Sequence, residues 1–188
     1  MKSTILFGGS FNPPHRGHGA LCAYLSREEW VDSIWLLPTY THPFGKPLVP
    51  FEHRLEMCNR LLRDHGLETT CQVSEVEKEL GGVSRTYDTV SYLMNQQQGK
   101  IFSWVIGADL LAELPGWYRA EELIKKISFT VVRRKGTYCP PSDFRVLDEE
   151  MPEIASSEIR YLIETGGKVS AFLSSGVDDY VRNLGLYR

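Results

Sequence analysis

The sequence predicts an α/β protein with a Rossmann-like, doubly wound parallel sheet, in a single domain over residues 1–188. Three observations predict it. The chain is long enough for one such domain with a substantial core. Apolar, strand-like runs alternate with helix-like segments, and no internal repeat or low-complexity linker interrupts them. Alternating strands and helices favour a parallel sheet that is covered by helices on both faces.

The first half of the chain shows this alternation from its start. The run STILFG, residues 3–8, predicts a buried strand, and GALCAYLSREE, residues 19–29, predicts a helix. SIWLLP, residues 33–38, predicts a second strand, which leads into a proline-rich loop over 39–50. Spacings of four, three and four then place one helical face on Phe51, Leu55, Cys58 and Leu62.

The second half of the chain continues the pattern. TTCQVSEV, residues 69–76, predicts a strand, and a helix is expected over 86–97. IFSWVIG, residues 101–107, is a strongly apolar strand, followed by a helix near 119–126 and the strand SFTVVRR, residues 128–134. A short strand over 144–148 and helices near 156–165 and 176–184 complete the chain.

The loops that follow four of these strands are expected to meet, because ligands of doubly wound folds bind beyond the carboxyl ends of the strands. These loops are GGSFNPPHRGH (8–18), PTYTHPFGK (38–46), GADLL (107–111) and RRKG (133–136). The sequence therefore predicts a ligand site at this edge of the sheet.

Composition limits the partners and the compartment. The formal net charge of −3 argues against non-specific binding of nucleic acid or an acidic membrane, so a local cluster of donors must hold any anionic ligand. The four cysteines form no CxxC pair, which favours buried reduced thiols over disulfides or zinc. The start of the chain has no apolar signal core, and no run of about 18 apolar residues occurs. We therefore expect a cytoplasmic protein.

The stretch GGSFNPPHRGH has the composition of a phosphate-binding turn. Gly8 and Gly9 would let the backbone leave the strand sharply and approach a ligand closely. The N–H groups around Gly9, Ser10 and Phe11 could then surround phosphate oxygens. A glycine pair alone is weak evidence, but a strand, this turn and a helix in succession are a specific combination.

Two histidines stand at the end of this turn. His15 and His18 are three residues apart, so a helical first turn would put both rings on one face, at a helix N-terminus that attracts anions. Gly17 would remove a side chain from that approach. A metal site is the alternative, but no convincing third ligand lies close in the sequence.

This segment resembles the (H/T)xGH signature of the nucleotidyltransferase superfamily, and its form is most similar to that of bacterial nicotinate mononucleotide adenylyltransferases. The resemblance covers nearly the whole chain and implies a nucleotidyltransferase-type fold. It implies transfer of AMP from ATP to nicotinate mononucleotide, which yields deamido-NAD and pyrophosphate. It also implies Mg²⁺ carried with ATP and no metal ligand from the protein. The net charge predicts no nucleic-acid or membrane partner, and the chain is expected to act as a monomer or homodimer.

The second signature of that family, usually ISSTxIR, is similar to IASSEIR, residues 154–160. Hydroxyl groups, N–H groups and the guanidinium of Arg160 could meet one polyphosphate there. Ala155 replaces the first serine of the family pattern, which removes one hydroxyl. An ordinary capped helix with a surface arginine is the alternative interpretation.

Two further segments bear on the mononucleotide. GADLLAELPGWYR, residues 107–119, is similar to the family segment in which an aspartate bonds a ribose and a tryptophan stacks on the pyridine, here Asp109 and Trp117. A tryptophan in the core is the alternative. SRTYDTV is similar to SYTxDT, with Thr86 in place and Arg85 where tyrosine is usual. THPFGKP and FEHRLEM offer Lys46 and Arg54 as basic residues, or merely a solvated basic face.

The resemblance assigns roles residue by residue. The implied catalytic residues are His18, which would donate to the α-phosphate, with His15 and Arg160, which would hold the triphosphate. The implied ATP-binding residues are Gly8, Gly9, Ser10, Phe11, His15, His18, Gly107, Asp109, Arg134, Ser156 and Arg160. The implied mononucleotide-binding residues are Ser10, Asn12, Lys46, Thr86, Trp117 and Tyr118.

Two other functions remain open from the sequence. Another member of the superfamily could use nicotinamide mononucleotide, phosphopantetheine, or glycerol phosphate with CTP, although Thr86 and Trp117 favour a pyridine nucleotide. A non-catalytic nucleotide sensor or RNA-binding module is the alternative from another class. Both histidines are present and the charge balance disfavours RNA, so an enzyme is the favoured interpretation.

Overall fold

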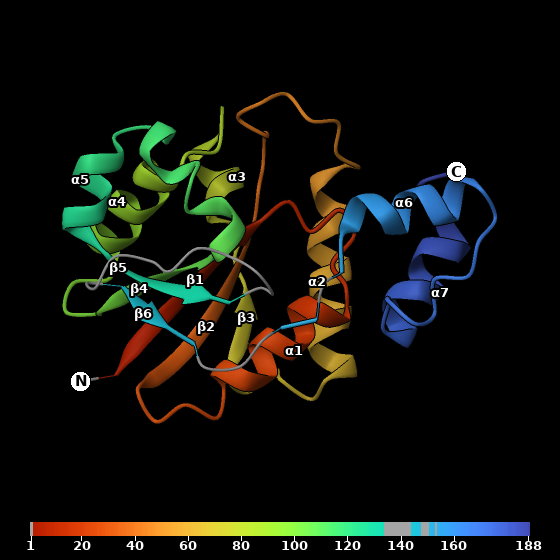
Figure 1. The fold of residues 1–188 in the computed structure, drawn as a ribbon, viewed down its shortest axis with the longest axis horizontal. Helices are drawn as coiled ribbons and strands as arrows, with labels where there is room; N and C mark the ends of the chain where they lie inside the picture. Colours follow the sequence, from red (N-terminus) through yellow and green to blue (C-terminus); the bar gives the residue numbers. More distant parts are fainter. Residues whose placement is uncertain (1, 134–143, 148–150, 153) are drawn as a thin grey trace.

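Six parallel strands form the middle layer of the computed structural model, which describes residues 2–133, 144–147, 151, 152 and 154–188 (Figure 1). The strands are β1 (Ser3–Gly9), β2 (Val31–Pro38), β3 (Cys71–Val73), β4 (Phe102–Gly107), β5 (Ser128–Val132) and β6 (Arg145–Val146). Their order is β3-β2-β1-β4-β5-β6, with parallel pairing throughout. The direction of winding reverses between β1 and β4, so the predicted doubly wound fold is confirmed.

Helices cover both faces of the sheet. One face carries α1 (Arg16–Leu25) and α2 (Phe51–Asp64). The other carries α3 (Val76–Leu80), α4 (Thr86–Gln96) and α5 (Ala120–Lys126), with the 3₁₀ turns η1 (Ala108–Leu110) and η2 (Leu114–Gly116) leading from β4 to α5. The last two helices, α6 (Ser156–Glu164) and α7 (Ser175–Leu184), lie beyond α2 at one side of the molecule (Figure 1).

Alternation along each strand divides the core between the two faces. In β1, Ile5 packs with α1 and α2, whereas Leu6 packs with the helices of the opposite face. In β4, Val105 joins the first cluster, whereas Trp104 and Ile106 join the second. All five side chains are at most 4% exposed, as expected for strands buried on both faces.

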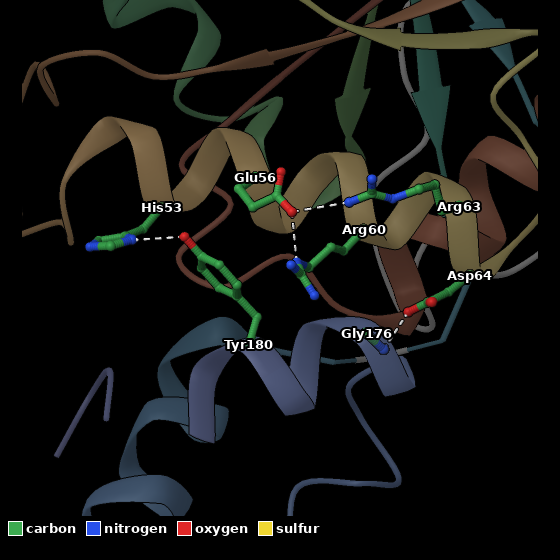
Figure 2. A network of polar contacts seen from close by, with 7 residues as sticks. All are labelled: His53, Glu56, Arg60, Arg63, Asp64, Gly176 and Tyr180. Carbon is green, nitrogen blue, oxygen red and sulfur yellow. Dashed lines mark hydrogen bonds and ion pairs between the residues drawn. The ribbon is translucent and has the colours of Figure 1, made fainter. Parts of the chain in front are cut away.

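A third apolar cluster and a polar network attach α7 to α2. The cluster joins Met57 and Leu61 of α2 to α6 and α7. In the network, the Tyr180 hydroxyl lies 3.0 Å from His53 Nδ1, and Asp64 Oδ2 accepts the Gly176 N–H at 2.7 Å (Figure 2). An acceptor at the first turn of α7 satisfies an N–H that has no partner within the helix.

Several predicted boundaries differ from the observed ones. The first helix covers Arg16–Leu25 rather than 19–29, because residues after Ser26 turn back toward β2, with a bond from the Val31 N–H to the Glu28 carbonyl. The expected strand over 69–76 is shorter, since β3 is Cys71–Val73 and the chain then forms α3, a helix that was not expected. The strand expected over 128–134 ends at Val132 within the described residues.

The predicted cysteine chemistry is confirmed where the structure describes it. Cys22, Cys58 and Cys71 are buried free thiols, while Cys139 lies outside the described residues. Burial raises the pKa of the Cys58 thiol far above its ordinary value, so this thiol stays protonated. None of the helices in the described part of the chain is long and apolar enough to cross a bilayer.

Candidate active site

The carboxyl ends of β1, β2 and β4 bring the predicted site residues to one edge of the sheet. Gly8 and Gly9 end β1, where they pair with Leu37 and Pro38 at the end of β2. Gly107 ends β4, the strand next to β1 on the other side. The loops that leave β1 and β4 therefore flank the point where the direction of winding reverses, the usual ligand position in this fold class.

The two glycines of the signature lie against aromatic side chains. Both lie within β1 rather than in a turn. A Cβ added to Gly8 would lie 2.3 Å from Trp104 Cζ2, and one added to Gly9 would lie 3.2 Å from Phe11 Cζ. Each missing side chain thus makes room for an aromatic ring beneath the turn.

The sharp turn itself falls at Phe11, which has a positive φ of 46°. Its ring is 2% exposed and meets the Phe7 ring edge-on at 5.3 Å and the His18 ring at 5.0 Å. A non-glycine residue with this backbone is uncommon and persists where its surroundings hold it. The buried ring therefore anchors the turn whose N–H groups are predicted to bind phosphate.

The two histidines pair at the start of α1, so the expectation that both rings share one face is confirmed. His15 is the N-cap residue, and its N–H donates to His18 Nδ1 at 3.1 Å. The ring centroids are 3.6 Å apart with an interplanar angle of 25°. Because Nδ1 of His18 accepts this bond, the neutral ring carries its proton on Nε2 and is a donor there.

Gly17 protects this arrangement. A Cβ at Gly17 would lie 3.1 Å from His15 Nδ1 and 3.3 Å from the Pro152 carbonyl oxygen, so its absence gives the His15 ring its space. The first turn of α1 is also tied to residues near α7. The Arg16 N–H donates to the Phe172 carbonyl at 2.8 Å, and Arg16 Nε donates to the Leu173 carbonyl at 2.9 Å.

The second signature contacts the first. Ser156 Oγ donates to the Pro13 carbonyl at 2.9 Å, and Arg160 Nη1 donates to the Asn12 carbonyl at 2.7 Å. Ala155 is the N-cap residue of α6 and makes no side-chain cap. Ser156 and the half-buried Arg160 therefore both bond the turn between β1 and α1, so Arg160 is more than a surface residue of an ordinary capped helix.

Asn12 and Arg54 have structural partners that the sequence did not indicate. Asn12 is 3% exposed, and its Oδ1 accepts bonds from the Tyr187 hydroxyl at 2.9 Å and the Val49 N–H at 3.2 Å. Arg54 is 1% exposed and donates to the carbonyls of Ser10 at 3.0 Å and Val49 at 2.9 Å. The solvated basic face is therefore wrong for Arg54.

The predicted nucleoside residues after β4 lie in and just beyond the strand end. Gly107 is its last residue, and Asp109 is an exposed residue of η1. Their position beside the signature turn suits a carboxylate that bonds ribose hydroxyls. Arg134, the remaining predicted ATP ligand, lies outside the described residues.

Two of the predicted mononucleotide residues, Thr86 and Tyr118, form a cluster with Arg85 at the start of α4. Thr86 is the first residue of α4, and the first N–H groups of a helix have no partner within it. The Arg85 guanidinium lies 4.2 Å from the centre of the Tyr118 ring. Trp117 is half-buried and packs against the core cluster that α4 also joins, so it combines a core contact with a partly open ring. Lys46 is exposed in the loop before α2.

A cavity of about 240 Å³ opens beside this cluster, between α3 and α4. Glu77 and Arg85 are among its lining residues. Glu77 is 6% exposed, and its carboxylate accepts the Tyr40 N–H at 3.2 Å. Burial raises the pKa of Glu77. The sequence did not single out Glu77, because an acid in EVEKEL is typical of a solvated helix face.

No group of three or more histidine, cysteine or acidic side chains that could hold a metal ion is found in residues 2–133, 144–147, 151, 152 and 154–188. His15 and His18 instead contact each other and the turn before them. The N-terminus of α1, the two imidazoles and the Arg160 guanidinium thus all adjoin the turn between β1 and α1. These are donors suited to a polyphosphate.

Comparison with known proteins agrees with this geometry. Residues 6–162 match the family described as Cytidylyltransferase-like. A protein of Myxococcus xanthus named "Probable nicotinate-nucleotide adenylyltransferase" is 37% identical over 187 residues, which cover 98% of this chain and 94% of that protein. A protein of the same name from Anaeromyxobacter dehalogenans is 38% identical over 193 residues, which cover 100% of this chain and 97% of that protein.

Solved structures share the fold. The Plasmodium falciparum nicotinic acid mononucleotide adenylyltransferase complexed with NaAD superposes with a TM-score of 0.87 at 20% identity, over 100% of this chain and 98% of that chain. The likeness at this identity concerns the arrangement of helices and strands, and it does not transfer the roles of individual residues.

Proposed function

Because this chain belongs to the Cytidylyltransferase-like family, and within it to the nicotinate-nucleotide adenylyltransferases, we propose that it transfers AMP from ATP to nicotinate mononucleotide. The products are deamido-NAD and pyrophosphate. One observation carries the assignment on this chain's own residues: the stacked His15 and His18 pair at the start of α1, beside the signature turn.

The reaction joins two anions, so positioning and neutralisation of charge supply most of the catalysis. The 5′-phosphate of the mononucleotide attacks the α-phosphorus of ATP, the bond to the β-phosphate oxygen breaks, and pyrophosphate leaves. No nucleophilic side chain is needed. The His18 Nε2–H donates to the α-phosphate as negative charge builds there, and the N–H to Nδ1 bond from His15 keeps that proton on Nε2.

The remaining donors hold the triphosphate. His15 acts from the same end of α1, and Arg160 and Ser156 act from the start of α6. A guanidinium carries five N–H donors, so the bond from Arg160 to the Asn12 carbonyl is compatible with further bonds to phosphate. Mg²⁺ enters with the substrate as MgATP and neutralises charge on the triphosphate.

The acceptor is a pyridine nucleotide in acid form. The N–H groups at the start of α4 and near Tyr118 are donors, and they match both oxygens of a carboxylate. A carboxamide presents its NH₂ to one of these N–H groups and leaves that N–H unpaired. The unpaired donor corresponds to a preference of about 10- to 100-fold for the acid over the amide acceptor. The Plasmodium falciparum protein is complexed with NaAD, and this supports the acid form.

The surroundings of the reaction are part of the proposal. The three described cysteines are buried free thiols, which suits a reducing compartment, and ATP is met in the cytoplasm. We place the enzyme there as a monomer or homodimer.

Pyrophosphate release from ATP tests the function directly. The protein is incubated with MgATP alone and then with nicotinate mononucleotide, nicotinamide mononucleotide or phosphopantetheine, and glycerol phosphate is tested with CTP. We expect release only when an acceptor is present, with the highest kcat/KM for nicotinate mononucleotide. Equal constants for the two pyridine acceptors would overturn the acid preference. Binding of ATP without release under every acceptor would support the nucleotide sensor instead.

A further inference from the structure

Three separate segments hold the backbone of the turn between β1 and α1. The Ser10 carbonyl accepts a bond from Arg54 of α2 at 3.0 Å. The Asn12 and Pro13 carbonyls accept bonds from α6, at 2.7 Å and 2.9 Å. The remaining contact comes from beyond α7, through a side chain. The turn that carries the predicted phosphate N–H groups is thus fixed by contacts from distant parts of the chain.

The Asn12 side chain is the centre of that last contact. Its Oδ1 accepts two bonds, from the Tyr187 hydroxyl at 2.9 Å and from the Val49 N–H at 3.2 Å. Its Nδ2 donates to the Pro47 carbonyl at 3.4 Å. Two donors on one side and an acceptor on the other define the orientation of the amide, so Asn12 connects the turn to the loop before α2 and to Tyr187.

The position of Tyr187 keeps its hydroxyl a hydrogen-bond donor to Asn12. Tyr187 follows α7 in the left-handed region, with a φ of 66°, and it is half-buried. Burial raises the pKa of its phenol, although Arg160 and Arg54 act in the opposite direction. The hydroxyl therefore stays protonated across the working pH range and remains a donor to Asn12.

We propose that Tyr187 is a positioning residue for catalysis, whose hydroxyl holds Asn12 and so keeps the turn before His15 in its reactive geometry. The proposal rests on the proposed adenylyl transfer. It extends the site to a side chain 175 positions away in sequence from Asn12, one that contacts the turn rather than the reacting atoms.

The test compares two tyrosines near the same helix. Tyr187→Phe removes the bond to Asn12, whereas Tyr180→Phe removes the bond between Tyr180 and His53 Nδ1, at 3.0 Å, on the α2–α7 contact (Figure 2). Each change deletes one hydroxyl and one hydrogen bond, but only the first bond reaches the turn. Tyr180→Phe is therefore a matched control for a general loss of stability.

We expect Tyr187→Phe to lower kcat by about 3- to 10-fold, because loss of one hydrogen bond that sets geometry has this order of effect. Both Michaelis constants should change less than kcat. Tyr180→Phe should keep kcat within about twofold of the parent. If the two variants lose kcat equally, or neither loses it, the positioning role is overturned.

Asn12→Ala provides a second route if Tyr187→Phe does not fold. It removes the acceptor of the Tyr187 hydroxyl together with the bonds to Val49 and Pro47, so it should lower kcat at least as much as Tyr187→Phe does. In the double variant the two losses should not add, because both remove the same bond. Fully additive losses would show that Tyr187 acts elsewhere.

Amide hydrogen exchange separates this inference from the proposed function. Peptides that cover residues 8–18 should exchange faster in Tyr187→Phe than in Tyr180→Phe. This readout needs no substrate. If the parent releases no pyrophosphate with any acceptor, the proposed function fails while the exchange result still decides whether Tyr187 holds the turn. Equal exchange in both variants would overturn the inference even in an active enzyme.

Discussion

Substitution of Gly8 by alanine distinguishes the two roles that this glycine could have. If Gly8 serves the packing of the core, a methyl group there must displace the Trp104 ring. The added Cβ would lie 2.3 Å from Cζ2 and 2.6 Å from Cη2 of Trp104, whereas ordinary contacts begin at 3.4 Å. Trp104 is 4% exposed within a packed cluster, so the ring has little room to move by the required distance of about 1 Å.

The expected cost follows from overpacking of a core. Such changes destabilise by about 1–3 kcal/mol, which corresponds to a fall of about 2–12 °C in Tm for a chain of this size. Urea unfolding and calorimetry of Gly8→Ala measure it. Gly9→Ala is the matched comparison, because its Cβ would meet the Phe11 ring at 3.2 Å and should cost less.

A double variant identifies the cause. Trp104→Phe shortens the ring that Gly8→Ala would strike, so the two changes together should be more stable than the sum of their separate effects predicts, by about 1 kcal/mol or more. A Gly8→Ala protein of parental stability with weakened ATP binding would refute this reasoning. It would show that Gly8 serves the approach of a ligand, as the sequence alone suggested.

Three further predictions concern the acceptor side of the site. Trp117→Ala should raise KM for nicotinate mononucleotide with little change in KM for ATP, because loss of a stacked base costs about 1–3 kcal/mol; a variant that fails to unfold cooperatively would show that Trp117 is chiefly a core residue. Arg85→Tyr should reduce the preference for the acid acceptor by about two- to fivefold, since the guanidinium that lies over Tyr118 contributes as an exposed charge; an unchanged ratio of kcat/KM values for the two acceptors would exclude that contribution. Burial raises the pKa of Glu77 in the folded state, so folding favours the protonated carboxyl. The folded protein therefore loses stability as pH rises through that raised pKa. The stability of Glu77→Gln relative to the parent should therefore increase as pH rises above the ordinary pKa of a glutamate, as measured by urea unfolding, and a difference that is constant with pH would contradict the shift.

Local patterns predicted the frame of the fold well. Strongly apolar runs such as 101–107 mark strands that are buried on both faces, and their alternation with helices leads directly to a parallel sheet. The pairing of His15 with His18 was also predictable, since it depends on three-residue spacing at a helix start. Short elements were harder, because the five residues of α3 carry too little periodicity to distinguish them from the end of a strand.

Contacts between distant segments could not be predicted. The bond from Tyr187 to Asn12 joins opposite ends of the chain, and the close packing of Trp104 against Gly8 depends on the register of two strands. Arg54 likewise looked like one basic residue of a helix, and only its burial against Ser10 shows that it supports the turn. These are tertiary effects with no signal in the neighbouring residues.

His18→Ala, assayed at saturating ATP and nicotinate mononucleotide, tests the central claim most directly. Removal of a donor aimed at charge in the transition state costs about 10²–10³ in rate, so kcat should fall by that factor while the Kd for ATP changes only modestly. Because His18 Nδ1 accepts the His15 N–H, the stability of the variant is measured alongside, and kcat is taken well below its Tm. A variant within about tenfold of the parental kcat would contradict the assignment of His18 as the donor to the α-phosphate.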